Sequence, residues 1–321
     1  MAKEAKKKSA DGKKASKGEA DVDRQPIRSF LKAVVLLAFI GVSVYAYLRA
    51  RDHVVTNVTF SHDPPKVALK DRPSWMSDAL ANKIMRVAAP DVSYSAFDHQ
   101  LLVNTAMLLR THPDSAPWIK SVRSVRREFE NAPGDTLEID CEFRAPVALV
   151  KWETYYWLID GDGILLPEQY TQPDLRKVMY DGDHLSLRII EGVAKSPPES
   201  GQTWQGADLA AGIDMIKLLY SKPYADEIER ISVVNFGGRQ DPREAQLVLI
   251  TRYQTQVRWG RPRFAKDFLI EVTPEQKLDY MARMVKQFGR VDAKHSWVEL
   301  RFDEVRYPST DDFGSEANTG H

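Results

Sequence analysis

Few side chains in this sequence have the spacing that catalysis or metal binding requires. The 321 residues lack a nucleophile elbow, an HExxH pair and the glycine-rich loops that bind nucleotides. The seven histidines are scattered without ligand spacing at His53, His62, His99, His112, His184, His295 and His321. We therefore expect a protein that binds a partner rather than an enzyme, and we expect no cofactor and no metal.

The clearest candidate for a cation site is Asp160-Gly161-Asp162-Gly163. It begins like a calcium loop, but the later carboxylate ligands and the terminal glutamate are missing. Glycine and aspartate tolerate the positive φ of tight turns, and extended apolar runs flank the stretch, so it predicts a hairpin. Asp160, Asp162 and His184 are the residues whose substitution would test an enzymatic alternative.

Cysteine and charge narrow the class of protein further. Cys141 is the single cysteine, so an intrachain disulfide and a cysteine-based metal cluster are excluded. It alternates with Leu137, Ile139 and Phe143, which predicts a small core-facing side chain. The 45 basic and 45 acidic residues cancel, so no chain-wide field favours nucleic acid.

The N-terminal part has the pattern of a membrane anchor. Residues 1–29 contain nine Lys or Arg and few large apolar side chains, which predicts a disordered basic tail. Phe30–Leu48 follows as an apolar run with one charge, Lys32, and it is long enough to cross a bilayer. The exit lacks the small residues of a signal-peptide cleavage site, so we expect an uncleaved helix in contact with membrane lipid. The positive-inside rule places the tail in the cytoplasm and residues 49–321 outside.

The sequence pattern of the exported part predicts a compact α+β unit at residues 49–144. Val54–Phe60 is a β-branched run that predicts a strand. Two helical patterns follow, from Pro73 to Pro90 and from Phe97 to Pro113, and then extended stretches at 119–130 and 137–150. The predicted order is strand, helix, helix, strand, strand.

For residues 145–307, the sequence pattern predicts a mostly antiparallel β domain with two flanking helices. One helix carries Leu209, Ile213, Ile216 and Leu219, and extended runs lie at 228–234, 246–251 and 254–259. The last helix has a capping box at Thr273 and Gln276 and a terminal Gly289. A final strand is expected from Ser296 to about Tyr307, with a bulge or bend near Asp303 and Glu304, and residues 308–321 predict a disordered tail.

Several motifs, in this order behind one anchor, resemble the bacterial cell division family FtsQ/DivIB. They are Arg144-Ala145-Pro146-Val147-Ala148, the run YWLIDGDGILLP from Tyr156 to Pro167, Val257-Arg258-Trp259-Gly260, and WVELRFD from Trp297 to Asp303. The resemblance implies a POTRA-like βααββ domain, an FtsQ-type β domain, and a single-pass inner-membrane protein with its C-terminal domains outside the cytoplasm at the division septum.

The resemblance further implies a non-catalytic divisome scaffold for septal peptidoglycan synthesis. Its partners would be FtsB/FtsL-like single-span coiled-coil proteins, one of which adds a strand at the edge of the β domain, and other division proteins could bind the POTRA-like domain. Such an edge offers unpaired backbone groups to a partner. For this edge we predict Arg301, Asp303, Glu304, Val305, Arg306 and Tyr307, with Arg243 as a cationic contact. Core packing is the preferred interpretation of Phe302.

Two alternatives stay open from the residues alone. A POTRA-bearing chaperone or translocation component would bind many extended peptides at the same edge. A membrane-anchored envelope enzyme would depend on residues such as Asp160. The basic and aromatic residues between Arg252 and Arg263 could stack on nucleic acid, but the predicted topology places them outside the cell.

Overall fold

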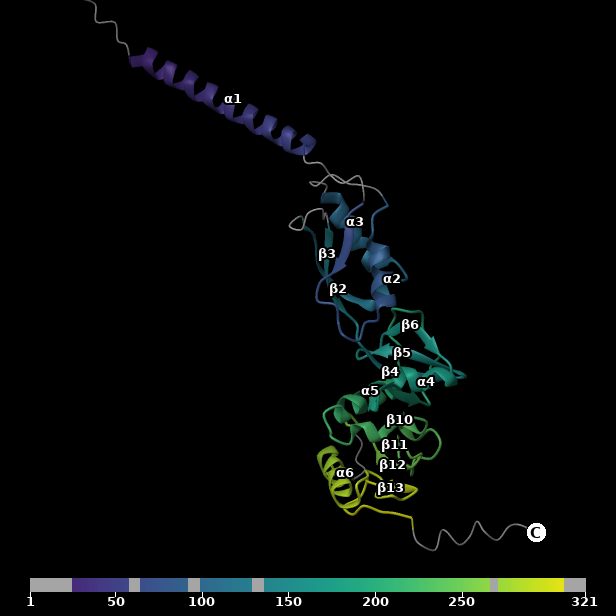
Figure 1. The fold of residues 1–321 in the computed structure, drawn as a ribbon. Coiled ribbons are helices and arrows are strands. Elements are labelled where there is room, and N and C mark those ends of the chain that lie inside the picture. Colours follow the sequence, from purple (N-terminus) through teal and green to yellow (C-terminus); the bar gives the residue numbers. More distant parts are fainter. Residues whose placement is uncertain (1–24, 58–63, 92–98, 129–135, 266–270, 309–321) are drawn as a thin grey trace, which may run out of the picture. The chain divides into compact units, whose positions relative to one another are not determined.

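A computed structural model describes residues 25–57, 64–91, 99–128, 136–265 and 271–308 (Figure 1). The chain divides into two compact units, Met1–Phe60 and Ser61–His321. The fold is mixed α+β, with one apolar N-terminal helix and several sheets. The predicted disordered segments at 1–24 and 309–321 lie outside the described residues.

The first unit contains one long helix, α1 (Gln25–Asn57). Within it, Lys32–Asp52 is long and apolar enough to cross a membrane. Its large apolar side chains, from Phe30 to Leu48, are exposed, as expected of a surface that lipid would cover. The predicted span Phe30–Leu48 lies inside this helix.

The helix extends beyond the predicted span at both ends. Residues 25–29, expected to belong to the disordered tail, are helical, and so are Val54–Asn57, expected to start a strand. Those two expectations were wrong. Extending an existing helix by a turn is favourable once it has nucleated, and this outweighs the weak strand preference of β-branched residues. The remainder of the predicted strand, 58–60, lies outside the described residues.

The second unit begins with a three-stranded sheet in the order β1-β3-β2. Its elements are β1 (Lys66–Leu69), α2 (Asp78–Ala88), α3 (His99–Thr111), β2 (Ile119–Glu128) and β3 (Thr136–Phe143). β1 is parallel to β3, and β2 is antiparallel to it. The predicted βααββ order holds, although β1 lies later than Val54–Phe60 and α2 starts after Ser77, whose hydroxyl accepts the Leu80 amide at 3.2 Å, rather than at Pro73.

The remaining strands form one eight-stranded sheet in the order β13-β12-β11-β10-β9-β4-β5-β6. Their bounds are β4 (Pro146–Trp152), β5 (Tyr155–Asp160), β6 (Leu165–Tyr170), β9 (Arg188–Glu191), β10 (Ile228–Ser232), β11 (Leu247–Thr251), β12 (Gln256–Gly260) and β13 (Trp297–Glu299). Four neighbouring pairs are antiparallel, and three are parallel: β4 with β9, β9 with β10, and β12 with β13. The sheet is therefore more mixed than the sequence pattern indicates.

Helices and short turns connect these strands. The helices are α4 (Leu175–Met179), α5 (Ala207–Leu219) and α6 (Pro274–Phe288), and a small hairpin is made by β7 (Tyr180–Asp181) and β8 (His184–Leu185). Single 3-10 turns lie at Ala116–Trp118, Gln172–Asp174, Ala225–Glu227 and Phe236–Gly238. The predicted helix through Leu209 and Leu219 and the predicted helix after the Thr273 cap are both present.

Two hydrophobic cores share the central strands. Ala148 and Val150 pack with α5 and α6 in one core, whereas Leu149 packs with Ile139 and Cys141 of the βααββ part in the other. Alternate side chains of β4 point to opposite faces, so this strand is buried on both sides. The second core contains residues of both the βααββ part and the large sheet, and so it joins them.

Candidate functional site at the C-terminal sheet edge

β13 lies at one end of the eight-stranded sheet and is parallel to β12. The Gln256 amide donates to the Ser296 carbonyl, and the Leu300 amide donates to the Arg258 carbonyl, each at 3.0 Å. Val298 and Leu300 are fully buried in the core. This edge is where the sequence predicts a partner strand.

The predicted final strand from Ser296 to Tyr307 was too long, because the strand ends at Glu299. The chain bends over residues 301–304 and then returns beside β13, where Arg306 and Glu299 exchange two backbone hydrogen bonds of 2.9 and 3.2 Å. The Tyr280 hydroxyl on α6 donates to the Asp303 carbonyl at 2.6 Å and holds the bend. The bend near Asp303 and Glu304 was therefore predicted, but the strand beyond it was not.

Segment 305–307 is the outermost extended backbone of this edge. Arg306 faces β13, so the backbone groups of Val305 and Tyr307 point away from the sheet. Within the described residues these groups make no backbone hydrogen bond. An added strand could pair with them without breaking an internal bond.

Charged side chains hold the chain in place just after β13. Arg301 donates to both carboxylate oxygens of Glu299, at 2.7 and 2.8 Å, and to the Arg243 carbonyl at 2.6 Å. The hydrogen bond with Glu299 raises the pKa of Arg301. The Arg301 side chain is therefore paired and only 14% exposed.

Arg243 has the exposure that a contact with a partner requires. Its side chain is 89% exposed, and it binds both oxygens of Asp241, at 3.2 and 3.0 Å, which raises the pKa of Arg243. Arg243 and Arg301 do come together, but through the Arg243 carbonyl rather than through two free cations. A partner carboxylate would have to compete with Asp241.

A second buried pair lies behind the edge. Lys277 on α6 is 2% exposed and donates to Glu271 at 2.6 Å, and its ammonium lies 5.3 Å from the centre of the Trp259 ring. Burial lowers the pKa of Lys277. Pairing offsets the cost of burying both charges and ties α6 to the residues before it.

The aromatic residues of the edge differ in their surroundings. Phe302 is half-buried between the guanidinium groups of Arg306 and Arg301, 3.8 and 5.4 Å from its ring centre, so the preferred core interpretation was wrong. The bend after Leu300 turns Phe302 away from the core face. Tyr307 packs on the core beside His295, with 4.6 Å between the ring centres.

A hollow of about 290 Å³ lies between the edge and α6. It is lined by Tyr280, Arg283, Met284, Gln287, Asp303, Glu304, Val305 and Tyr307. The four α6 residues were missed from the sequence, where only the ends of this helix were predicted. Their spacing of i, i+3, i+4 and i+7 is the signal that could have found them.

Asp160, Asp162 and His184, which would test an enzymatic alternative, lie in local hydrogen bonds and ion pairs. The Asp160 carboxylate accepts the amides of Asp162 and Ile164, at 2.9 and 2.8 Å, and pairs with Arg144 at 2.9 Å. His184 pairs instead with Asp226 at 2.8 Å. No cluster of three or more metal-binding side chains occurs in the described part of the chain. Cys141 is buried as predicted.

Neither comparison of the sequence with known proteins found a relative: no family model matches the chain, and no curated protein matches it.

Proposed function

We propose that this chain is a non-catalytic scaffold of the bacterial division machinery, of the FtsQ/DivIB kind. The observation that carries the proposal is the outermost segment 305–307, whose Val305 and Tyr307 backbone groups are unpaired within the described residues beside a hollow on α6. A sheet edge of this kind takes up an extended partner segment, and neighbouring side chains then set register and specificity.

The order of the helix and the two folded parts along the chain supports the same proposal. A helix able to span a membrane precedes a βααββ unit in the strand order β1-β3-β2, which is the arrangement expected of a POTRA-like domain. A sheet that ends in a capped helix and a short edge strand follows. The tail would lie in the cytoplasm, and the POTRA-like and β domains would lie outside the inner membrane, at the septum.

The partner in this proposal is an FtsB/FtsL-like single-span coiled-coil protein. Its extended segment would pair with Val305 and Tyr307, and its side chains would enter the hollow lined by Tyr280 and Met284. Arg283, whose side chain is 62% exposed beside Asp279, offers a positive charge at the rim. The proposal thus assigns Asp303–Tyr307 to binding and leaves Arg301 as their support.

Photo-crosslinking in the native cell tests the proposal. A photoreactive phenylalanine replaces Tyr307 in the full-length chain, and the matched control replaces Tyr220, which is 80% exposed on another element. We expect the first probe to crosslink a small single-span coiled-coil protein and the second to give no such product. Depletion of the chain should then give filaments that do not divide.

Other outcomes would favour other functions. Crosslinks from Tyr307 to many unrelated extended segments would support the chaperone or translocation alternative. The same product from both probes, or none from Tyr307 in a folded chain, would remove the edge from the proposal.

A further inference from the structure

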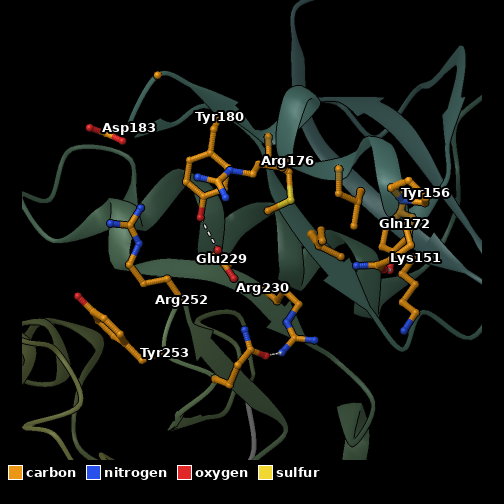
Figure 2. Close-up of a pocket in the computed structure, with 16 residues that line it drawn as sticks. Lys151, Tyr156, Gln172, Arg176, Tyr180, Asp183, Glu229, Arg230, Arg252 and Tyr253 are labelled. Carbon is orange, nitrogen blue, oxygen red and sulfur yellow. Dashed lines mark hydrogen bonds between the residues drawn. The ribbon is translucent and has the colours of Figure 1, made fainter.

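A cleft of about 600 Å³ opens on the β domain, and none of its lining residues belongs to the edge described above (Figure 2). Its walls come from β4, from β10, from the turn between β11 and β12, and from the segment of residues 172–183. These elements are distant in sequence and converge only because β9 and β10 follow β4 in the sheet. The proposed scaffold function makes no use of this cleft.

Positive charge dominates the lining. Lys151, Arg176, Arg230 and Arg252 face two acids, Asp183 and Glu229, which leaves an excess of two positive charges. Glu229 already accepts the Tyr180 hydroxyl, and Arg230 donates to Gln254 (Figure 2) and lies 3.7 Å from Glu191.

In the part of the chain that the structure describes, three of the four cations have no carboxylate within ion-pair distance, although a hydrogen bond with Tyr180 and the charge of Glu229 raise the pKa of Arg252. Within the described residues, Lys151, Arg176 and Arg252 make no ion pair, although other basic side chains nearby do. All three are exposed in the cleft rather than buried in its walls. Cations that outnumber the acids of a concave site attract an anionic ligand.

The buried apolar residues of the cleft indicate the chemical class of the anion that it binds. Leu175, Met179 and Ile189 are buried at the floor, where they can contact an apolar side chain. The guanidinium of Arg252 lies 5.8 Å from the centre of the Tyr180 ring, and that of Arg290 lies 3.5 Å from the centre of the Tyr253 ring. A cation therefore lies over one face of each ring.

We infer that the cleft binds an extended acidic peptide segment of a partner protein, with carboxylates on Lys151, Arg176 and Arg252 and an apolar side chain on the Leu175 and Met179 floor. Charge-assisted hydrogen bonds from guanidinium groups would supply most of the specificity. Contact with the apolar floor would make the cleft prefer this peptide to a polyanion that has no apolar side chains.

The test uses the full-length chain in detergent micelles, with empty micelles as the blank, and four dye-labelled nonapeptides. Each peptide alternates two residue types: Glu with Leu, Gln with Leu, Glu with Ser, or Gln with Ser. Charge and apolar content therefore vary independently among the four peptides. Fluorescence anisotropy gives each affinity. We expect the Glu and Leu peptide to bind about tenfold or more tightly than the other three.

Paired variants locate the binding. The double variant Lys151→Gln with Arg176→Gln should weaken the Glu and Leu peptide about tenfold or more, because two charge-assisted contacts are lost. The double variant Lys151→Arg with Arg176→Lys should keep most of the affinity. The matched control Lys66→Gln with Lys286→Gln removes the same charge from exposed positions elsewhere and should leave affinity within about twofold.

Three results would overturn the inference. Equal binding of the Gln and Leu peptide would remove the role of charge, and an equal loss in the matched control would remove the role of the cleft. Binding of an oligogalacturonate that depends on Lys151 and Arg176, without binding of the Glu and Leu peptide, would replace the peptide by an anionic glycan. None of these results bears on the crosslinking test at Tyr307.

Discussion

Among single residues, Asp160 shows how a motif that suggests chemistry can serve the fold. One carboxylate oxygen closes the turn of the β5–β6 hairpin, and the other pairs with Arg144. Arg144 in turn follows β3, and its amide donates to the Trp118 carbonyl at 2.8 Å. The two motifs around Arg144 and Asp160, which carry much of the family resemblance, therefore meet in one buried ion pair.

Asp160→Asn should lower the free energy of unfolding by about 3 kcal/mol, because Arg144 is left in a largely buried site without its counter-charge. Urea denaturation followed by circular dichroism measures the change. Asp162→Asn is the matched control: the Asp162 side chain is more than half exposed and pairs with exposed Lys120, so its cost should stay under about 1 kcal/mol. Equal costs at the two positions would argue against a structural role for the buried pair.

Cys141 should make stability fall in alkali. Burial raises the pKa of its thiol to about 11, above the ordinary value of 9.0. As pH rises, the unfolded chain loses this proton first, so the contribution of the neutral buried thiol is complete below pH 9 and is lost as pH rises to about 11. The difference in unfolding free energy between the native chain and Cys141→Ala should therefore shrink by about 2 to 3 kcal/mol over that range. A constant difference across the range would contradict the assignment.

Among the elements, α6 is the helix whose ends are most clearly encoded. The Gln276 amide donates to the Thr273 hydroxyl, the Thr273 amide donates to the Gln276 side chain at 2.9 Å, and Gly289 ends the helix with a φ of 77°. These interactions are local, and so they could be predicted from spacing alone. They bear on the proposed function because α6 supplies one wall of the hollow beside the edge that is proposed to bind a partner.

Thr273→Ala should cost about 1 kcal/mol of unfolding free energy, since it leaves a helix-terminal amide without its acceptor. Thr273→Ser keeps the hydroxyl and should cost less than half as much. Both values come from urea denaturation of the full chain in micelles. If the serine variant loses as much as the alanine variant, packing of the threonine methyl group, and not the cap, is the main contribution.

The last strand shows the limit of predicting one element from its own pattern. Alternation of apolar and polar residues indicated a strand to Tyr307, but alternation describes a local pattern and not where its partner ends. β12 stops at Gly260, whose φ of 101° turns the chain, so after Leu300 the chain no longer pairs with β12, and the Arg301 carbonyl accepts the Val272 amide at 3.0 Å. Arg301 then binds Glu299 and the Arg243 carbonyl instead of continuing the ladder.

For the molecule as a whole, the proposed orientation of α1 across a membrane can be tested directly. In a Cys141→Ser background, cysteine is introduced by Ser16→Cys before the helix or by Ser200→Cys after it. A membrane-impermeant maleimide should label the second in cells with a permeabilised outer envelope and the first only after lysis, because nine basic residues precede the span. The reverse pattern would contradict the proposed orientation.

Features that depend on neighbouring residues could be predicted from the amino-acid sequence alone. These are the apolar span, the capped helix α6, the hairpin at Asp160 to Gly163, and the burial of Cys141 on an alternating strand. Each is set by interactions within a few residues along the chain, so spacing was enough to predict it.

The way in which distant strands combine could be known only from the folded chain. The fold sets the position of β9 between β4 and β10, the return of Arg306 beside Glu299, and the gathering of Lys151, Arg176 and Arg252 around one cleft. These arrangements depend on contacts between segments that are far apart in the sequence, whose energies come from burial on both faces of the central strands. A local sequence pattern does not show which distant segments will pair. The edge and the cleft could therefore be identified only in the folded chain.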